Sequence, residues 1–249
     1  MSTRLSLPTS IKHRFSARSE PVVIPTIIAG AAFAAAPVAE KPRTNGVVSL
    51  DGTEVAVYWD DGDTFYVPSL DLKARLSGYN TLESYGPVHR FGPGEHALYK
   101  IASEATALAK SEVWACTTTA TEGGYGRKGV DCPDLRRALL EGGLAHVFAV
   151  QAGAPQADLD AQARGIAAKN GMWSGGAPKY IVTSVHSLDE KEGAETTYNR
   201  VMETATGVAS ERRHSNIHQA CEWVCMEDSC LLYVPYNQRY GSNKAACLK

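Results

Sequence analysis

The chain has no excess of basic residues, because 25 lysines and arginines stand against 27 aspartates and glutamates and give a formal net charge of −2. Proteins that coat nucleic acid with their whole surface are usually basic, so the charge balance argues against that class. The sequence also lacks internal repeats and long low-complexity tracts, which excludes a repeat architecture. Of its 249 residues, 44% are hydrophobic and 21% are charged, which is ample for one globular core with a smaller appendage.

Residues 1–39 have the pattern of a targeting segment, with a basic start followed by an uncharged, mostly apolar stretch over 22–39. The sequence Ala32-Phe33-Ala34 offers an A-x-A-like cleavage site, so we predict a signal peptide and a secreted or periplasmic protein. The alternative is an uncleaved N-terminal membrane anchor, for which the stretch is at the lower limit of length. Removal of residues 1–39 takes away four basic groups and Glu20, and it leaves an acidic mature protein with 21 basic and 26 acidic residues.

The six cysteines lack the paired C-x2-C knuckles that four-cysteine zinc sites usually show. All of them follow residue 39, and an even number in an exported chain favours disulfides. Cys116 and Cys132 flank a turn between two predicted strands, so a bridge between them would staple that hairpin. Two further disulfides are predicted among the last four cysteines, which have the spacing C-x3-C-x4-C-x16-C and whose pairing the sequence leaves open: Cys221, Cys225, Cys230 and Cys247.

A mixed zinc site is the alternative interpretation of the C-terminal cysteines. His214 and His218 are four residues apart, which would place both on one helical face. Together with Cys221 and Cys225 they would supply nitrogen and sulfur ligands of the kind that zinc prefers. Disulfides and ordinary surface histidines explain the same residues, so the zinc site is the second choice.

The pattern of hydrophobic residues predicts an α+β protein. We divide it into a main domain at 46–175, whose bounds follow from a family resemblance, and a C-terminal extension at 176–249. Short β-rich runs and period-two alternation predict strands at 47–50, 55–59, 64–67, 72–79 and 112–118. Helical periodicity predicts helices at 95–110, after Pro133 as far as Gly142, and at about 157–169. The extension contains a strand-like run at 180–185 and the last four cysteines, which predicts a small α+β appendage stapled by disulfides.

Acidic, amide and arginine side chains recur in order along the main domain. They are Asp61, Asp63, Arg75, Asn80, Thr81 and Glu83, followed by Tyr125-Gly126-Arg127. Carboxylate and carbonyl oxygens bind hard cations such as Ca²⁺ or Mg²⁺, and guanidinium groups bind phosphate oxygens two at a time. A carboxylate that is not needed for the metal is able to take a proton from water. Together these groups suit metal-assisted hydrolysis of a phosphodiester.

The order and spacing of these residues resemble the staphylococcal nuclease (thermonuclease) family over roughly residues 46–175. The matching stretches are Asp61-Gly62-Asp63-Thr64, residues 74–83, Tyr125-Gly126-Arg127, residues 143–147 and Gly171-Met172-Trp173-Ser174. The resemblance implies a five-stranded β-barrel of the OB type with about three helices, to which the Cys-rich appendage is added. OB barrels bind oligonucleotides on one open face.

The resemblance also implies a metal site formed by Asp63, Asn80 and the backbone carbonyl of Thr81. Ca²⁺ is the expected ion and Mg²⁺ the alternative. Asn80 departs from the family, which has a second aspartate there, and an amide oxygen adds no charge, so metal binding should be weaker or favour another ion. Leu82 replaces a proline of the family pattern. Asp61 is expected to stabilise the turn, or support a ligand, rather than bind the metal itself.

The remaining roles concern the substrate. Glu83 matches the family's general base, which acts on the water that attacks phosphorus. Arg75 and Arg127 would neutralise the phosphate and the extra charge of the transition state. Tyr125 would pack near a sugar or phosphate. The family also stacks tyrosines on a base after the position of Val147, but this chain has Phe148-Ala149-Val150-Gln151 there, and Phe148 is expected in the core.

The leading hypothesis is an exported, metal-dependent nuclease, a hydrolase that cleaves DNA and RNA phosphodiesters with low sequence preference. DNA or RNA would be its substrate, and we expect a monomer without a stable protein partner. The second hypothesis is a catalytically weak nuclease-like module that binds nucleic acid or protein, which only Asn80 favours. A third is that the extension binds a partner in the cell envelope and the barrel serves as its scaffold.

Overall fold

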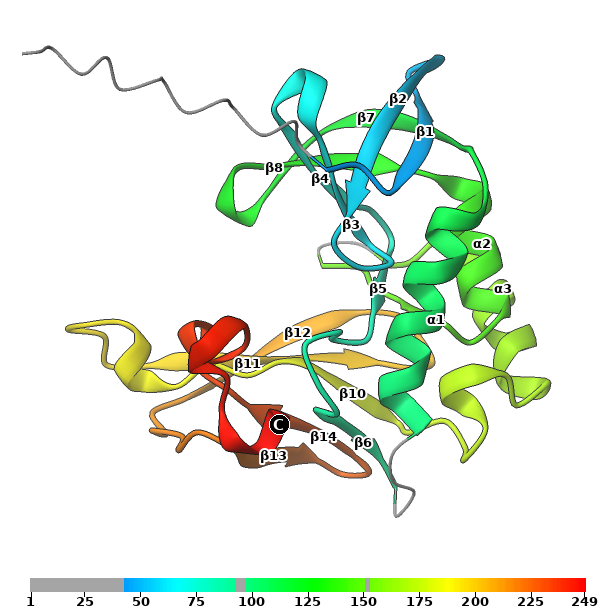
Figure 1. Cartoon of the computed structure of the whole chain (residues 1–249). Helices are drawn as coiled ribbons and strands as arrows, with labels where there is room; N and C mark the ends of the chain where they lie inside the picture. Colours follow the sequence, from blue (N-terminus) through cyan, green and yellow to red (C-terminus); the bar gives the residue numbers. More distant parts are fainter. Residues whose placement is uncertain (1–42, 93–96, 151–152) are drawn as a thin grey trace, which may run out of the picture. The chain divides into compact units, whose positions relative to one another are not determined.

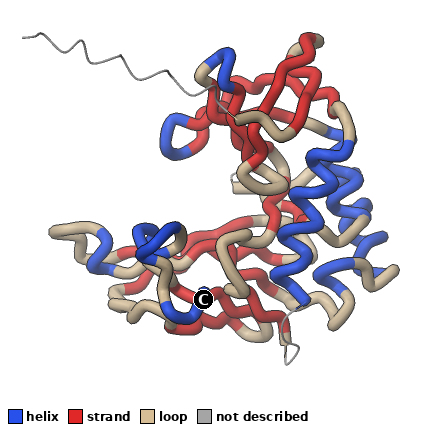
Figure 2. The backbone as a smooth tube through the Cα atoms, in the orientation of Figure 1, coloured by secondary structure: helices blue, strands red, loops and turns tan. Residues whose placement is uncertain are grey.

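The computed structural model describes residues 43–92, 97–150 and 153–249, and these described residues belong to one compact unit (Figure 1). The predicted targeting segment at 1–39 lies outside the described residues. The described part is an α+β structure with a closed β-barrel, three α-helices and three smaller sheets, which confirms the predicted class. Figure 2 shows how strands and helices divide the chain.

The barrel closes with six strands rather than the five that the resemblance implied. In order around the barrel they are β1 (Gly46–Leu50), β2 (Thr53–Trp59), β3 (Thr64–Val67), β4 (Leu72–Leu76), β8 (Arg127–Asp131) and β7 (Trp114–Gly123). Asp51 and Gly52 both have positive φ, 50° and 81°, which makes a tight turn between the two strands predicted at 47–50 and 55–59. The chain before the acidic turn therefore forms two barrel strands, β1 and β2, paired antiparallel.

Strand β4 has the predicted alternation of buried and exposed side chains, but it ends at Leu76, whereas the prediction extended to residue 79. Ala74 and Leu76 are buried while Lys73 is exposed, as the period-two pattern predicted. The strand ends at Leu76 because Gly78 has φ +86°, a conformation that favours glycine. The chain then starts a separate short strand, β5 (Tyr79–Thr81), which pairs with β9 (Ala145–Val147).

The three α-helices agree with the predicted positions. They are α1 (Ala97–Ser111), α2 (Pro133–Glu141) and α3 (Gln156–Ala167). Pro133 occupies the first turn of α2, where its missing N–H costs nothing, and Gly142 follows its last residue. Helix α2 packs against α3 and β7, while α1 contacts β1 and β2 (Figure 1).

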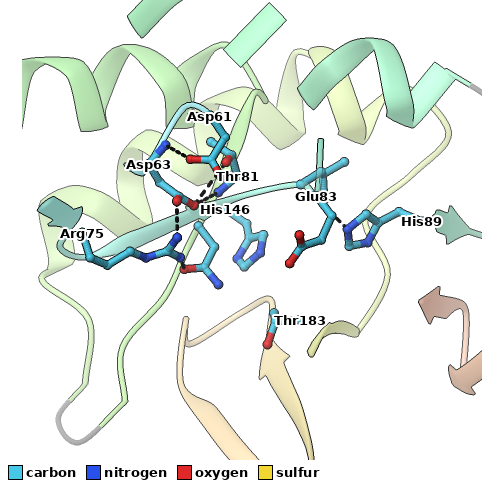
Figure 3. Close-up of a pocket in the computed structure, with 10 residues that line it drawn as sticks. Asp61, Asp63, Arg75, Thr81, Glu83, His89, His146 and Thr183 are labelled. Atoms are coloured by element: carbon cyan, nitrogen blue, oxygen red, sulfur yellow. Dashed lines mark hydrogen bonds and ion pairs between the residues drawn. The ribbon is translucent and has the colours of Figure 1, made fainter. Parts of the chain in front are cut away.

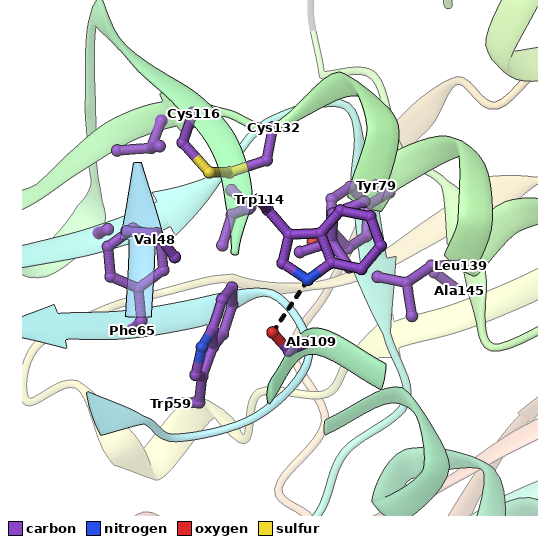
Figure 4. Packing of buried hydrophobic residues seen from close by; sticks show 14 of the residues in the cluster. Val48, Trp59, Phe65, Tyr79, Ala109, Trp114, Cys116, Cys132, Leu139 and Ala145 are labelled. Atoms are coloured by element: carbon purple, nitrogen blue, oxygen red, sulfur yellow. Dashed lines mark hydrogen bonds between the residues drawn. A yellow bond between two sulfur atoms is a disulfide. The ribbon is translucent and has the colours of Figure 1, made fainter. Parts of the chain in front are cut away.

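The barrel core is built from large aromatic and aliphatic side chains around the Cys116–Cys132 disulfide (Figure 4). Trp59 and Phe65 meet edge to face with ring centroids 4.9 Å apart, and Trp114 donates from Nε1 to the carbonyl of Ala109 at 3.0 Å. The disulfide joins β7 to the residue before α2, which confirms the predicted pairing.

The extension contains a sheet of β10 (Tyr180–Ser184), β11 (Thr197–Glu203) and β12 (Ala209–His214), followed by the hairpin of β13 (Glu222–Met226) and β14 (Ser229–Tyr233). Its described helical segments are all short 3₁₀ turns, so the expected α-helix is absent from 176–249. Disulfides join Cys221 to Cys247 and Cys225 to Cys230. These bonds use the cysteines that the alternative zinc site required, and that alternative is wrong.

Strand β14 also pairs with β6 (His89–Phe91), which comes from the main domain. Tyr85 and Val88 in the preceding loop are buried with Leu231 and Val234 of the extension. The segment from Tyr85 to Phe91 is therefore held in place by the extension.

The described residues include no helix that is long and apolar enough to cross a membrane. Their three disulfides fit a protein that folds outside the reducing cytoplasm.

Candidate active site

A small polar pocket brings together six of the predicted site residues (Figure 3). These are Asp61, Asp63, Arg75, Asn80, Thr81 and Glu83. Leu82, His89, His146 and Thr183 complete the lining. The pocket has a volume of about 40 Å³. That is enough for a water molecule or a small ion but not for a nucleotide.

The acidic turn between β2 and β3 is folded by its own side chains. Asp61 accepts a hydrogen bond from the backbone N–H of Asp63 at 3.0 Å, a local contact that favours aspartate in turns. Gly62 is required because a Cβ atom there would lie 2.7 Å from Thr81 and 2.9 Å from Ala105. The turn therefore approaches β5 and α1 closely, and this brings both carboxylates to the pocket.

Asp63 connects three segments of the chain. Its side chain is buried, with 2% of the residue exposed. Oδ1 accepts from the Arg75 guanidinium and from the Thr64 hydroxyl at 2.9 Å. Oδ2 accepts from the backbone N–H of Thr81 at 2.8 Å and from its hydroxyl at 3.1 Å. A buried carboxylate with this many donors is fixed in place, as a metal ligand or an electrostatic anchor must be.

Arg75 lies between the two side chains that were predicted to bind metal. Nη1 donates to Asp63 and Nη2 donates to the side-chain oxygen of Asn80. Burial alone would lower the pKa of Arg75, but the negative charges of Asp63 and Asp61 raise it above its usual value. The arginine thus stays charged and neutralises part of the acidic pair.

The oxygen donors of the pocket fit a hard divalent cation by their chemistry. Burial, and then the nearby charge of Asp63, raise the pKa of Asp61 well above its usual value. The positive charge of Arg75 therefore does not fully compensate the negative charges of the two carboxylates. Within the described ranges, no cluster of three His, Cys, Asp or Glu side chains is placed to hold a metal. A cation would thus depend on Asp63, Asn80, the Thr81 carbonyl and water, with Asp61 beside them.

Glu83 follows β5 and directs its carboxylate into the pocket, near the ring of His146 and opposite Thr183 (Figure 3). Burial raises its pKa, and the charge that opposes this most strongly is that of Arg239 in the extension. The charges of Arg75 and Arg127 act in the same direction as that of Arg239, with less effect. A raised pKa makes a carboxylate a stronger base, which suits proton transfer from water.

Two buried histidines, His89 and His146, line the pocket. His89 accepts the backbone N–H of Glu83 at Nε2, with a separation of 3.1 Å, and so fixes the loop that carries Glu83. Burial lowers the pKa of His89 to about 3 and that of His146 to about 4, so both rings are neutral at pH 7. His146 lies opposite Asn80 in the pairing of β9 with β5. Neither histidine was among the site residues predicted from the sequence.

Arg127 and Tyr125 do not line the pocket. Tyr125 lies on the turn between β7 and β8, and Arg127 is the first residue of β8, where it donates from Nε to the carbonyl of Gly124 at 3.0 Å. Its guanidinium carbon is 5.9 Å from the centre of the Tyr125 ring, and Tyr125 is 93% exposed. The structure therefore separates these two predicted residues from the other six.

Two contributors come from beyond the family-like region, where no motif could reveal them. Thr183 of β10 lines the pocket directly, and Arg239 acts on Glu83 through its charge. Phe148, in contrast, is half-buried and packs against a core cluster, as predicted.

The fold and the pocket together define an α+β barrel protein with a buried acidic and arginine-containing site. A scan against models of known protein families finds no match, and a search of curated proteins finds no significant match. The resemblance to the thermonuclease family therefore depends on the motifs and on the site that they form.

Proposed function

We propose that this protein is an exported, metal-dependent nuclease that hydrolyses DNA and RNA phosphodiester bonds with low sequence preference. The observation that carries the proposal is the meeting of Asp63, Arg75, Asn80 and Glu83 in one polar pocket, although they come from separate elements. Three disulfides support a secreted or periplasmic location. The expected substrate is nucleic acid, and the expected active form is a monomer.

In this proposal the oxygen donors bind the cation and the arginines bind the phosphate. Asp63, Asn80 and the Thr81 carbonyl would hold a divalent cation, Ca²⁺ before Mg²⁺, and the cation would supply positive charge to the scissile phosphate. Arg75 would exchange part of its bonding from Asp63 and Asn80 to a phosphate oxygen. Arg127 would reach the same phosphate from its turn.

Glu83 would orient the attacking water and take its proton. Its backbone is fixed by His89 at 3.1 Å, which holds the carboxylate in the pocket. The leaving oxygen would depart in line with the attack. By its resemblance to the family, the protein would cleave the 5′ P–O bond and leave 3′-phosphates.

The test is a cleavage assay on single- and double-stranded DNA and RNA with Ca²⁺, Mg²⁺ or EDTA. Shortening that requires the metal and disappears in EDTA is the expected result. Cleavage that is unaffected by EDTA would contradict the metal assignment, and no cleavage under any condition would contradict the activity.

The second candidate is a catalytically weak module that binds nucleic acid or protein. It is favoured by Asn80, which adds no charge, and by the bonds from Arg75 to both Asp63 and Asn80. Binding without shortening in the same assay would select it.

A further inference from the structure

The extension places a cationic side chain beside the proposed catalytic site. Arg239 has the largest effect of any charge on Glu83, ahead of Arg75 and Arg127. Its Nε donates to the carbonyl of Val234 at 2.9 Å, and its guanidinium carbon lies 4.8 Å from the centre of the Tyr85 ring. Val234 is fully buried, so the arginine is held on a packed base.

The anchoring of Arg239 uses only one end of its guanidinium group. The contacts to Val234 and Tyr85 involve Nε and the face of the group. Its terminal nitrogens have no hydrogen-bond partner in residues 43–92, 97–150 and 153–249. A guanidinium held in this way keeps its outer donors for a ligand, and an anion with several oxygens is the ligand that matches them.

Three tyrosines form a chain of ring contacts that starts at Tyr85, the ring against which Arg239 lies. Tyr240 lies between the other two, with ring centroids 6.2 Å from Tyr85 and 6.4 Å from Tyr236. Tyr85 is buried, whereas Tyr240 is 58% exposed and Tyr236 is 77% exposed. Exposed aromatic rings on a fixed base, next to an arginine, are the components with which proteins bind single-stranded nucleic acid.

This aromatic group lies close to the acidic pocket. Tyr85 follows Glu83 of the pocket by two residues, and its ring contacts both the Arg239 guanidinium and the Tyr240 ring. The pocket itself, at about 40 Å³, has no room for a base. The nucleotide that flanks the scissile phosphate must therefore rest outside it.

Residues 148–150, which follow β9, supply no exposed aromatic ring. Phe148 is half-buried against a core cluster, and Val150 is aliphatic. Tyr125 is exposed on the turn between β7 and β8 but does not line the pocket.

We propose that Arg239, Tyr236 and Tyr240 form a nucleotide subsite, in which the tyrosines stack on a base of a single strand and Arg239 binds the phosphate next to the scissile one. The inference rests on the proposed nuclease function and assigns the substrate contact to the extension. Stacking on a side chain requires an unpaired base, so the subsite selects single strands or frayed ends.

The test measures binding of a fluorescent single-stranded octanucleotide with Ca²⁺ in the Glu83→Gln background, which prevents cleavage during the measurement. A second octanucleotide has the same backbone but abasic residues. Tyr240→Ala and Tyr236→Ala should each weaken binding of the normal strand by roughly 5- to 100-fold, the range for a base stacked on an aromatic ring. Binding of the abasic strand should change by less than about twofold, because only the base contact is lost.

Tyr58→Ala is the matched control, because Tyr58 is an exposed tyrosine of β2 that does not line the pocket. Tyr240→Phe keeps the ring and should retain binding. Equal losses for the normal and abasic strands, or losses no larger than that of Tyr58→Ala, would overturn the subsite.

Arg239 is tested through salt dependence. Arg239→Ala should weaken both strands and reduce the slope of log affinity against log salt by about 0.7, the value for one phosphate on a single strand. Arg239→Lys should keep the slope. In the parent chain with Glu83 intact, Arg239→Ala should raise KM more than it lowers kcat, and an unchanged KM and slope would overturn the phosphate contact.

Failure of the subsite is distinguishable from failure of the proposed function. If the unsubstituted protein neither binds nor cuts nucleic acid, both are overturned. If it cuts, and the tyrosine and arginine variants match the Tyr58→Ala control, only the subsite is overturned.

Discussion

The barrel side and the extension side of the pocket differ in how their polar groups are used. On the barrel side, Asp63, Arg75 and Asn80 bind one another and leave little freedom for movement. On the extension side, Arg239 keeps its outer donors, and Tyr236 and Tyr240 are exposed. The comparison suggests that the barrel side is organised for charge and chemistry, whereas the extension side offers a surface to the rest of the substrate. Substitutions on the two sides should therefore affect turnover and binding differently.

The largest effect is expected from Glu83→Gln, which removes the proposed base and keeps the size of the side chain. Turnover should fall by about 10²- to 10⁴-fold, as expected for loss of a general base. The affinity for single-stranded DNA should stay within about twofold, because the base acts on water and not on binding. Steady-state kinetics and fluorescence anisotropy measure the two quantities. Turnover within a factor of two of the parent would remove Glu83 from the mechanism.

Arg75→Ala should lower cleavage by roughly 10²-fold or more, as expected for loss of a transition-state charge contact. Arg127→Ala should act in the same direction. Because Arg75 lines the pocket and Arg127 does not, we expect the larger loss in kcat for Arg75→Ala.

Arg137→Ala is a suitable control for both variants, since Arg137 is exposed on α2 and pairs with Asp134 at 2.9 Å. Normal cleavage by both single variants would show that the phosphate is bound by other groups. In that case Arg239 on the extension side would become the first candidate.

Lowering the pH should reduce the free energy of unfolding, because His89 is buried between the barrel side and the extension side of the pocket. Burial lowers its pKa in the folded protein to about 3, from an ordinary value of 6.5. The unfolded chain therefore takes up a proton at a higher pH than the folded protein does. The contribution of His89 is fully present above about pH 6.5 and is lost as the pH falls toward 3, by roughly 1.4 kcal/mol per pH unit.

Urea unfolding at pH 7 and pH 4.5 measures this loss in the free energy of unfolding. His89→Gln, whose amide oxygen is still able to accept from Glu83, should show a smaller difference between the two pH values than the parent protein. An equal difference for both proteins would show that His89 does not couple acid to unfolding.

The smallest expected effect comes from Asn80→Asp, which adds one negative charge to the proposed metal site. Carboxylate count is a main determinant of Ca²⁺ affinity, so the metal concentration for half-maximal cleavage should fall. The new carboxylate would also bind Arg75 more strongly, and the maximal rate is therefore expected to change less than the metal dependence. A metal titration of cleavage measures this. An unchanged midpoint would show that Asn80 is not a ligand.

The elements that depend on local patterns were predictable from the sequence. The period-two run in β4 and the helices α1, α2 and α3 follow from the spacing of apolar residues and from Pro133 and Gly142. The sixth barrel strand was obscured because the resemblance implied five, although the Asp51-Gly52 turn and the two β-rich runs around it were visible.

The candidate site was predictable only where its residues follow one another in motifs. Asp61, Asp63 and Glu83 meet in the pocket as their order suggested. Thr183 and Arg239 reach the site through the packing of the extension, which no spacing along the chain reveals. Cys225 and Cys230 show the same limit, because their pairing depends on the register of β13 with β14.

The pairing of β6 with β14 also bears on the order in which the protein is completed during synthesis. Residues 89–91 pair with residues 229–231, which leave the ribosome after all the barrel strands have been made. Domains generally fold from the N-terminus as the chain emerges, so the barrel strands up to β8 are able to associate first. The loop that carries Glu83 gains its partner strand only after the barrel strands have been synthesised. Chains that terminate early would therefore contain the acidic turn and Arg75 but lack the support that holds Glu83 in place.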